Sequence, residues 1–464
     1  MIFENATIIT MNKKRHIITH GAVVTKGTSI AAVGKSLEIV ERFPGEERID
    51  CNGHIIMPGL VDTHVHISQT MLRGLLEGEG PVDFFEWLTK YIWPLQGNFT
   101  EKDGCASASL TVLELIKSGT TGFIEVLLGK PYGFDGIAEM CVRSGIRACL
   151  GRTVMDPPPE VAERIGMHPG MWEKREECIP AALTAFDHWD QAGDGRIQVW
   201  FGARTPGENN RPSLYHELGR LAAERDMGIT VHLSELPEDI AYARSLGFRS
   251  PTEFAEAHGL LGPRTIFAHY IESDAADWDL VAETGTNISH NPASNAKEGW
   301  PVAPVSGMLA AGANVALGCD GGPVNNAMDL MRDLRMVSYA ARIHEKAPKV
   351  LPPETVLEMA ILNGYRAIGL SEQAGAIHPG MRADFIIIDT DKPHFEPMWN
   401  PVAAVVYAAS GADVDTVVIN GQVIMQGRKV LTLDEEGILE DVRRRYHDIA
   451  KRTGVDIRPV WPVI

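Results

Sequence analysis

The chain has 464 residues and contains few cysteines for this length. Its six cysteines include no CxxC pair, which favours reduced thiols over a disulfide framework. The start, MIFENATIIT, has no basic stretch followed by an apolar run, and no window offers about 18 consecutive apolar residues. We therefore expect a cytoplasmic protein that does not insert into a membrane.

The chain also has fewer basic residues than acidic ones. The chain carries 43 Lys and Arg against 61 Asp and Glu, a formal net charge of −18. This balance disfavours nucleic acid or an anionic membrane surface as the main partner. A hydrophobic content of 44% and a charged content of 22% are ordinary for globular proteins. The length favours one large domain with a smaller one.

Short runs of alternating apolar and polar residues mark both ends of the chain. They fill residues 1–57 and return in ADFIIIDTD and VDTVVINGQVIMQGRKVL, a pattern typical of small antiparallel sheets. We expect residues 1–57 and 371–431 to form one composite β-sandwich domain, with the middle of the chain inserted. The final segment, 432–464, begins with a charged helix near 434–452 that we expect to pack on the outside.

The middle of the chain, residues 58–370, repeats a buried strand followed by an amphipathic helix. Eight alternating units are typical of an α/β fold, the (β/α)8 TIM barrel, in which catalytic groups lie at the carboxyl ends of the strands. A doubly wound open sheet is the alternative, but no GxGxxG turn follows the first strand. The eight candidate strands are GLVDTHVH, TTGFIEV, RACLGRTV, RIQVWFGA, GITVHLSE, RTIFAHY, TNISHNP and NVALGCD.

Two histidines one residue apart end the segment IIMPGLVDTHVHI, which we read as a single buried strand over 55–67. Side chains alternate along a strand, so His64 and His66 point the same way and can bind one ion together. A chance HxH in a loop is the alternative for an isolated pair. The predicted ends of the fifth, sixth and eighth strands add His232, His269 and Asp320, and five such residues on one rim predict a metal site.

Histidines with a carboxylate and an open position fit Zn²⁺ or Fe²⁺ that activates water. Glu235 lies three residues after His232, where the strand has ended and the chain turns. A carboxylate there can serve as general base and then as general acid. The alternative is a glutamate that faces solvent and begins the next helix.

Further side chains are candidates for a substrate pocket at this rim. An aromatic side chain can stack on a planar ring, and an arginine can bind a ring carbonyl or a carboxylate. Core packing is the alternative for Trp87, and salt bridges at the rim are the alternative for the arginines. The predicted substrate-binding residues are Trp87, Arg152, Arg204, His290 and Asn295, and Trp300 is a further candidate.

The segments PGLVDTHVH, VHLSE, FAHY, SHNPASN and GCDGG follow in this order over nearly the whole chain, and together they resemble the amidohydrolase superfamily. They are most similar to its branch of S-adenosylhomocysteine/methylthioadenosine deaminases, cytosine and guanine deaminases and s-triazine hydrolases. The resemblance implies a barrel with a composite β-sandwich and a metal ion held by His64, His66, His232 and Asp320, with His269 beside the activated water. Members with two metals use a carboxylated lysine at the fourth strand end, and VWFGARTP has none, which implies one metal.

Two positions depart from the adenosine-type deaminases of this branch. Those enzymes typically carry a glutamate just after the WP of a segment like YIWPLQG, where this chain has Gln96, and a histidine where it has Arg204. Both departures argue against an adenosine substrate. The triazine hydrolases also lack these two residues, whereas SHNPASN and DGGPVNN are closer to the nucleoside deaminases.

The favoured function is metal-dependent deamination of an amino-substituted purine, pyrimidine, pterin or s-triazine ring with release of ammonia. We expect Glu235 to transfer protons, and Asp320 and His269 to orient the nucleophile and stabilise the developing charge. The alternatives are displacement of chloride or a substituted amine from such a ring and S-adenosylhomocysteine/methylthioadenosine deamination. A non-catalytic scaffold is disfavoured because every ligand residue is present. We expect one divalent transition metal per chain, Zn²⁺ with Fe²⁺ as the alternative, and a homo-oligomer, either a dimer or a tetramer.

Overall fold

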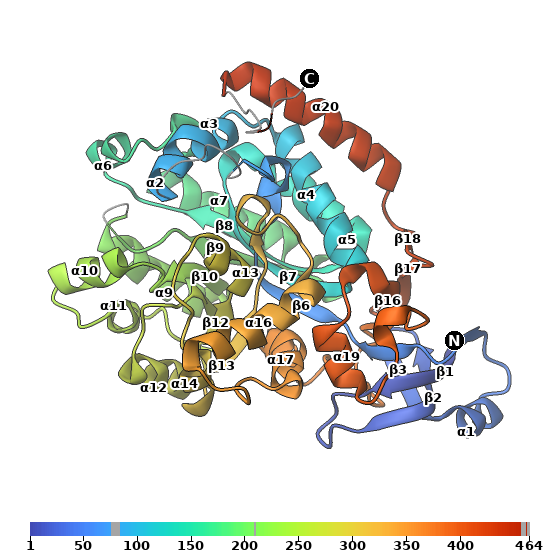
Figure 1. The fold of residues 1–464 in the computed structure, drawn as a ribbon. Helices are drawn as coiled ribbons and strands as arrows, with labels where there is room; N and C mark the ends of the chain where they lie inside the picture. Colours follow the sequence, from blue (N-terminus) through green and yellow to red (C-terminus); the bar gives the residue numbers. More distant parts are fainter. Residues whose placement is uncertain (76–83, 208–209, 456–460, 462–464) are drawn as a thin grey trace.

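The computed structural model describes residues 1–75, 84–207, 210–455 and 461. Its centre is a parallel sheet that curls into a barrel surrounded by helices (Figure 1). The predicted TIM barrel is confirmed, and each of the eight predicted strand segments contains a strand. The strands are β6 (Leu60–His66), β7 (Thr120–Leu128), β8 (Arg147–Val154), β9 (Ile197–Ala203), β10 (Gly228–Leu233), β11 (Thr265–His269), β12 (Asn287–His290) and β13 (Asn314–Leu317).

The eighth strand closes the barrel in two pieces. After β13, residues Gly318 and Cys319 lead into β14 (Asp320–Gly321). Strand β14 pairs in parallel with β6, and Asp320 lies opposite Val65. The last strand thus meets the first, and the carboxyl ends of all eight strands open on one rim.

Amphipathic helices cover the barrel. In α9, Leu214, Leu218 and Ala222 are buried at a spacing of four residues, and the helix ends at Asp226, which adopts a left-handed conformation. The longer helices that follow the barrel strands are α4 (Glu101–Lys117), α5 (Phe134–Ser144), α7 (Arg175–Trp189), α9 (Pro212–Arg225), α10 (Pro237–Ser245), α12 (Ala275–Thr284) and α16 (Leu330–Glu345).

A second sheet combines both ends of the chain, as the sequence predicts. Its two parts meet where β5 pairs antiparallel with β15, and the Phe3 and Phe385 rings pack 5.0 Å apart beside this junction. Residues 2–58 contribute β1 (Ile2–Ile9), β2 (Ile17–Lys26), β3 (Ser29–Lys35), β4 (Arg48–Asp50) and β5 (Ile55–Pro58). The C-terminal part contributes β15 (Phe385–Ile388), β16 (Val414–Ile419), β17 (Gln422–Gln426) and β18 (Lys429–Val430).

The single strand that the sequence predicts over 55–67 is wrong in one respect, because Gly59 divides it. Residues before Gly59 belong to the second sheet as β5, and residues after it belong to the barrel as β6. A Cβ at Gly59 would lie 2.1 Å from Thr121 Cγ2, so only glycine allows the chain to cross here so close to β7. The crossing joins the second sheet directly to the strand that carries His64 and His66.

Helix α20 (Glu435–Thr453) lies along the outside of the barrel next to α4 (Figure 1). Two of its arginines, Arg445 and Arg452, form ion pairs with Asp103 at the start of α4, at 3.0 and 2.7 Å. These ion pairs attach the C-terminal helix to the barrel. Among the described residues, no helix is long and apolar enough to cross a membrane.

Candidate active site

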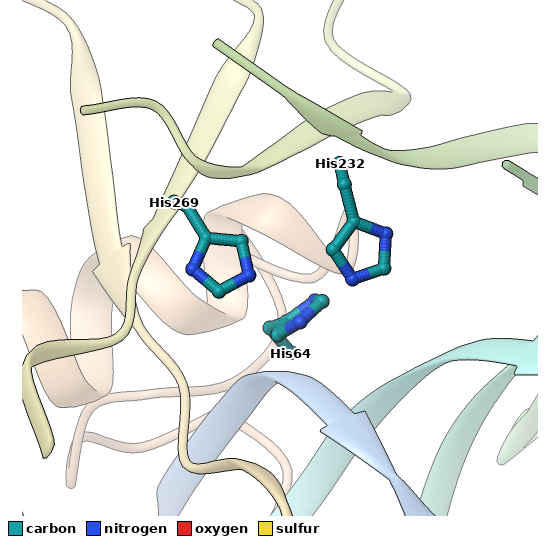
Figure 2. A group of neighbouring side chains, drawn as sticks. All are labelled: His64, His232 and His269. Carbon is teal, nitrogen blue, oxygen red and sulfur yellow. The ribbon is translucent and has the colours of Figure 1, made fainter. Parts of the chain in front are cut away.

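Four strands bring the five predicted ligand-type residues to the carboxyl rim of the barrel. Figure 2 shows the rings of His64, His232 and His269 facing one another, although they come from β6, β10 and β11. Their ligand atoms lie within 4.8 Å of one another, and so do those of His64, His66 and Asp320. His64 belongs to both groups, so the five side chains form one cluster.

The histidines of this cluster suit a metal ion. Burial lowers the pKa of His64, His66 and His232, for His66 to about 3, and so favours the neutral imidazole that coordinates metals. Both nitrogens of His64 and Nδ1 of His66 are buried and make no hydrogen bond. Buried polar atoms rarely lack a partner, and a cation among these nitrogens would supply one. The residues present therefore fit a transition metal.

Asp320 is the carboxylate among the five residues of this cluster. Its Oδ1 lies 3.5 Å from His64 Nε2 and 3.4 Å from His66 Nε2. Its Oδ2 accepts a hydrogen bond of 2.6 Å from Ser294 Oγ. The serine, which the sequence did not single out, fixes the carboxylate while leaving Oδ1 directed at the histidines.

Glu235 lies beside the cluster, beyond the end of β10. Its Oε1 is 3.5 Å from His269 Nε2, which also lies 3.7 Å from Asp320 Oδ2. Burial raises the pKa of Glu235 to about 7, a value suited to accepting and donating a proton near neutral pH. Asp239 holds the turn, since its Oδ2 accepts from the backbone nitrogen of Glu235 at 2.8 Å. The solvent-facing alternative for Glu235 does not fit this position.

The His269 ring is oriented from its other side. Its Nδ1 lies 2.9 Å from Asn295 Oδ1 and 3.3 Å from Asn291 Nδ2, while its Nε2 faces Glu235 and Asp320. Asn295 was predicted to bind substrate, and the structure instead places it behind His269, outside the residues that line the pocket. His290 is also buried away from the pocket lining, and burial lowers its pKa to about 3.

The backbone at three of these strand ends is strained. Ser234, His269 and Asp320 have φ angles of 54°, 68° and 68°, in the left-handed region that non-glycine residues seldom adopt. Each such residue costs about 1–3 kcal/mol, and such strain concentrates at functional sites. The left-handed conformation also interrupts the alternation of side chains along the strand, so the turn sets the direction of the His269 and Asp320 side chains.

Two carboxylates that the sequence reasoning missed tie the strand ends together. Asp62 Oδ1 accepts from the backbone nitrogens of His64 at 3.2 Å and Cys319 at 3.1 Å, which links β6 to the eighth strand. Glu125, in the second half of β7, accepts from the backbone nitrogens of Leu127 and Ile67. Asp62 lies inside the VDTHVH segment, a signal that could have identified it, whereas nothing near Glu125 in the sequence did.

A cavity of about 610 Å³ opens directly onto the cluster. This volume lies within the usual range for small-molecule sites. His66, His232, Glu235, His269 and Asp320 form part of its lining. The rest is largely aromatic and apolar and includes Trp87, Leu88, Ile92, Trp93, Tyr132, Met155, Met171 and Trp300.

Of the predicted substrate contacts, Trp87 and Arg204 line this cavity, as does Gln96. Arg152 does not. Its guanidinium forms two hydrogen bonds with the Glu173 carboxylate, at 2.8 and 2.5 Å, and both side chains are buried. The geometry supports the salt bridge that the sequence left open for Arg152.

A barrel with a histidine and aspartate cluster at its carboxyl rim, and a glutamate beside a deep cavity, defines a class of metal-binding barrel hydrolases. Residues 55–424 match the Amidohydrolase family. The chain belongs to that family and is a hydrolase acting on carbon–nitrogen bonds other than peptide bonds. A relative from Pelotomaculum thermopropionicum, a 5-methylthioadenosine/S-adenosylhomocysteine deaminase, is 33% identical over 97% of this chain and 99% of its own.

Solved structures share the fold over nearly the whole length. An adenosine deaminase from Xanthomonas campestris with bound zinc superposes with a TM-score of 0.88 at 24% identity, covering 97% of this chain and 98% of its own. An atrazine chlorohydrolase from Arthrobacter aurescens TC1, complexed with zinc, superposes with a TM-score of 0.85 at 24% identity, covering 96% and 99%. At these identities the likeness establishes the fold alone.

Proposed function

We propose that the protein is a metal-dependent deaminase that replaces the amino group of a heteroaromatic ring by oxygen from water and releases ammonia. One observation carries the proposal: a buried glutamate, Glu235, lies 3.5 Å from His269 Nε2 at the edge of a histidine and aspartate cluster that opens into a cavity. The deaminase relative at 33% identity supports the same reaction type.

His64, His66, His232 and Asp320 would hold one divalent transition metal, and Zn²⁺ is the ion we propose. Neutral nitrogens and one carboxylate fit it, and the zinc in the two solved structures adds support. When bound, the metal would act as a Lewis acid that lowers the pKa of water. His269 also belongs to one group of ligand atoms, so its position suits either coordination or the neighbouring role predicted for it.

The chain's own residues would move the protons. Glu235 takes a proton from the attacking water and passes it to the amino nitrogen, which leaves as ammonia while the ring carbon gains an oxygen. His269 keeps its Nε2 toward Glu235 and Asp320 because Asn295 holds its Nδ1. Ser294 holds Asp320 in place. Trp87 and Trp300, in the cavity wall, would contact the faces of a planar ring.

Displacement of chloride or a substituted amine remains the second candidate. Gln96 and Arg204 both line the cavity, and by the sequence resemblance they stand where the adenosine-type enzymes carry a glutamate and a histidine. A site built to bind ribose hydroxyls would lose its acidic acceptor with this exchange. The departures therefore favour rings without ribose, which include the triazines, and make adenosine-type nucleosides poor substrates.

The test is to screen purines, pyrimidines, nucleosides, pterins and s-triazines for ammonia release by metal-replete protein. A chlorotriazine in the same screen, followed by chloride release, measures the second candidate. Ammonia release from at least one ring amine supports deamination. Chloride release without ammonia release from any amine would contradict deamination and support displacement of chloride, the second candidate.

We also propose a cytoplasmic location and a homo-oligomeric state. All six cysteines are free thiols and five of them are buried, which fits a reducing compartment. Met336, Tyr339 and Ile343 share one face of α16 and are exposed, Ile343 by 78%, which would suit a contact between subunits.

A further inference from the structure

Arg204 is a cation in the cavity wall. It follows β9 directly, and its Nε is buried and has no hydrogen-bond partner. Among the residues that the structure describes, no carboxylate forms an ion pair with its guanidinium. Burial lowers the pKa of Arg204, and the neighbouring groups that oppose this shift are the phenols of Tyr132 and Tyr215. A guanidinium held this way is costly unless something else supplies the missing charge.

Two further residues of the cavity lining each carry a buried donor that has no hydrogen-bond partner among the described residues. Thr153 lies near the end of β8 and pairs with Gly202 of β9, two residues before Arg204. Its Oγ1 is buried and makes no hydrogen bond. The Nε2 of Gln96, on α3 (Trp93–Gln96), is likewise buried and without a partner. Three residues from separate parts of the chain thus line one cavity and carry buried donors whose hydrogen bonds are unmet in the described structure.

The position of Arg204 limits which part of a ligand it can meet. Arg204 lines the same cavity as three of the proposed metal ligands, His66, His232 and Asp320. A ligand group bound by Arg204 must therefore belong to the reacting ring or be attached directly to it, because the end of a long flexible substituent would lie farther from the metal ligands. Two carboxylates of the lining, Glu235 and Asp320, lie beside His269 instead, at 3.5 and 3.7 Å from its Nε2.

We propose that Arg204, Thr153 and Gln96 form a subsite for an acidic oxygen carried by the heteroaromatic ring, so that the substrate is an anionic amino-heteroaromatic. This inference rests on the proposed deamination and names the substrate class of the same site. The acidic oxygen can belong to a ring carboxylate or to an acidic ring hydroxyl. Both would accept charge-assisted hydrogen bonds from a guanidinium.

Binding of matched pairs to the metal-replete protein, measured by calorimetry, tests the subsite without requiring turnover. One pair is 5-carboxycytosine and cytosine, which differ in the carboxylate. The other is ammelide and melamine, which differ in acidic ring hydroxyls. We expect about tenfold or tighter binding of the anionic member in at least one pair, the value of one charge-assisted hydrogen bond, and the pair that shows it identifies the source of the oxygen.

Variants assign the preference to the three side chains. Arg204→Gln should remove it, Thr153→Val should reduce it, and Gln96→Glu should reduce it by placing a like charge beside the anion. The matched control is Arg211→Gln. Arg211 lies outside the cavity lining, is 49% exposed and pairs with Asp156 at 2.6 Å, so its variant should bind both pairs as the wild type does.

Equal binding within both pairs by the wild type would overturn the subsite, as would a preference that survives in Arg204→Gln. These failures are separable from failure of the proposed reaction. Ammonia release from uncharged ring amines that does not depend on Arg204 would support the proposed deamination and contradict the subsite. A preference for anions that depends on Arg204, with no ammonia released from any amine, would support the subsite and contradict the proposed deamination.

Discussion

Glu235→Gln is the substitution that bears most directly on the proposed mechanism. The amide keeps the size of the carboxyl group but cannot accept a proton from water, so the transfer to the leaving nitrogen is lost. A positioned general acid/base contributes about 10² to 10⁴ in rate. We expect kcat to fall by that factor, which corresponds to about 3 to 5 kcal/mol of transition-state stabilisation.

The structure indicates that this variant will fold. The turn that carries Glu235 is held through its backbone nitrogen by Asp239, and the contact of its carboxylate with His269 is long, at 3.5 Å. The four residues proposed to hold the metal are untouched, so metal content should stay at the wild-type value. Adding metal should therefore not restore activity.

The assay is the steady-state rate of ammonia release, with metal content measured by elemental analysis on the same samples. Glu238→Gln is the matched control, because Glu238 also lines the cavity but is exposed and lies outside the cluster. We expect that variant to stay within about tenfold of the wild type, well short of the loss expected of a general acid/base. Near-normal turnover in Glu235→Gln, or equal losses in both variants, would refute the role given to Glu235.

Three further predictions follow from the contacts of the described residues. Asp320→Asn should lose most of the activity and part of the bound metal, since it removes a charged ligand; a fully active variant would contradict the ligand assignment. Ser294→Ala should lower kcat by about tenfold while the metal is retained, because it frees the Asp320 carboxylate by removing one charge-assisted hydrogen bond, and unchanged kinetics would count against the serine. Asp103→Asn should lower the free energy of unfolding at pH 7 by about 1 to 2 kcal/mol. Burial alone would raise the pKa of Asp103, but hydrogen bonds from the backbone and hydroxyl of Thr100, and then from Arg452 and Arg445, lower it. Its stabilisation is therefore complete above the unfolded pKa of about 3.9 and is lost as the pH falls through the folded pKa. Urea unfolding at pH 7 and pH 3 should show the deficit shrinking in acid, and an equal deficit at both values would contradict the ionic role.

The barrel could be predicted from the sequence because the local patterns of apolar residues agree with the global fold. Eight apolar runs separated by amphipathic helices leave few other topologies, and the carboxyl ends of parallel strands necessarily meet on one rim. His64, His66 and His232 could be placed for that reason alone. The composite second sheet was predictable because alternating runs at both termini leave edges that only another strand can cover.

What the sequence did not predict depends on turns and on distant partners. Asn295 follows a strand end, as a substrate contact would, yet its short side chain reaches His269 first. The salt bridge of Arg152 is made by Glu173, which lies on a loop with no periodic pattern. Gly59 divides an apolar run that is continuous in the sequence, and only the proximity of Thr121 reveals the need for a glycine.

The central claim is that one metal ion, held by the histidine and aspartate cluster, is required for ammonia release from a ring amine. The most direct measurement is a titration of chelator-treated protein with Zn²⁺, in which ammonia release and bound metal are followed together. We predict that activity rises in proportion to bound metal and saturates at about one equivalent per chain. Full activity in the metal-free protein, or saturation only at two equivalents, would contradict this account.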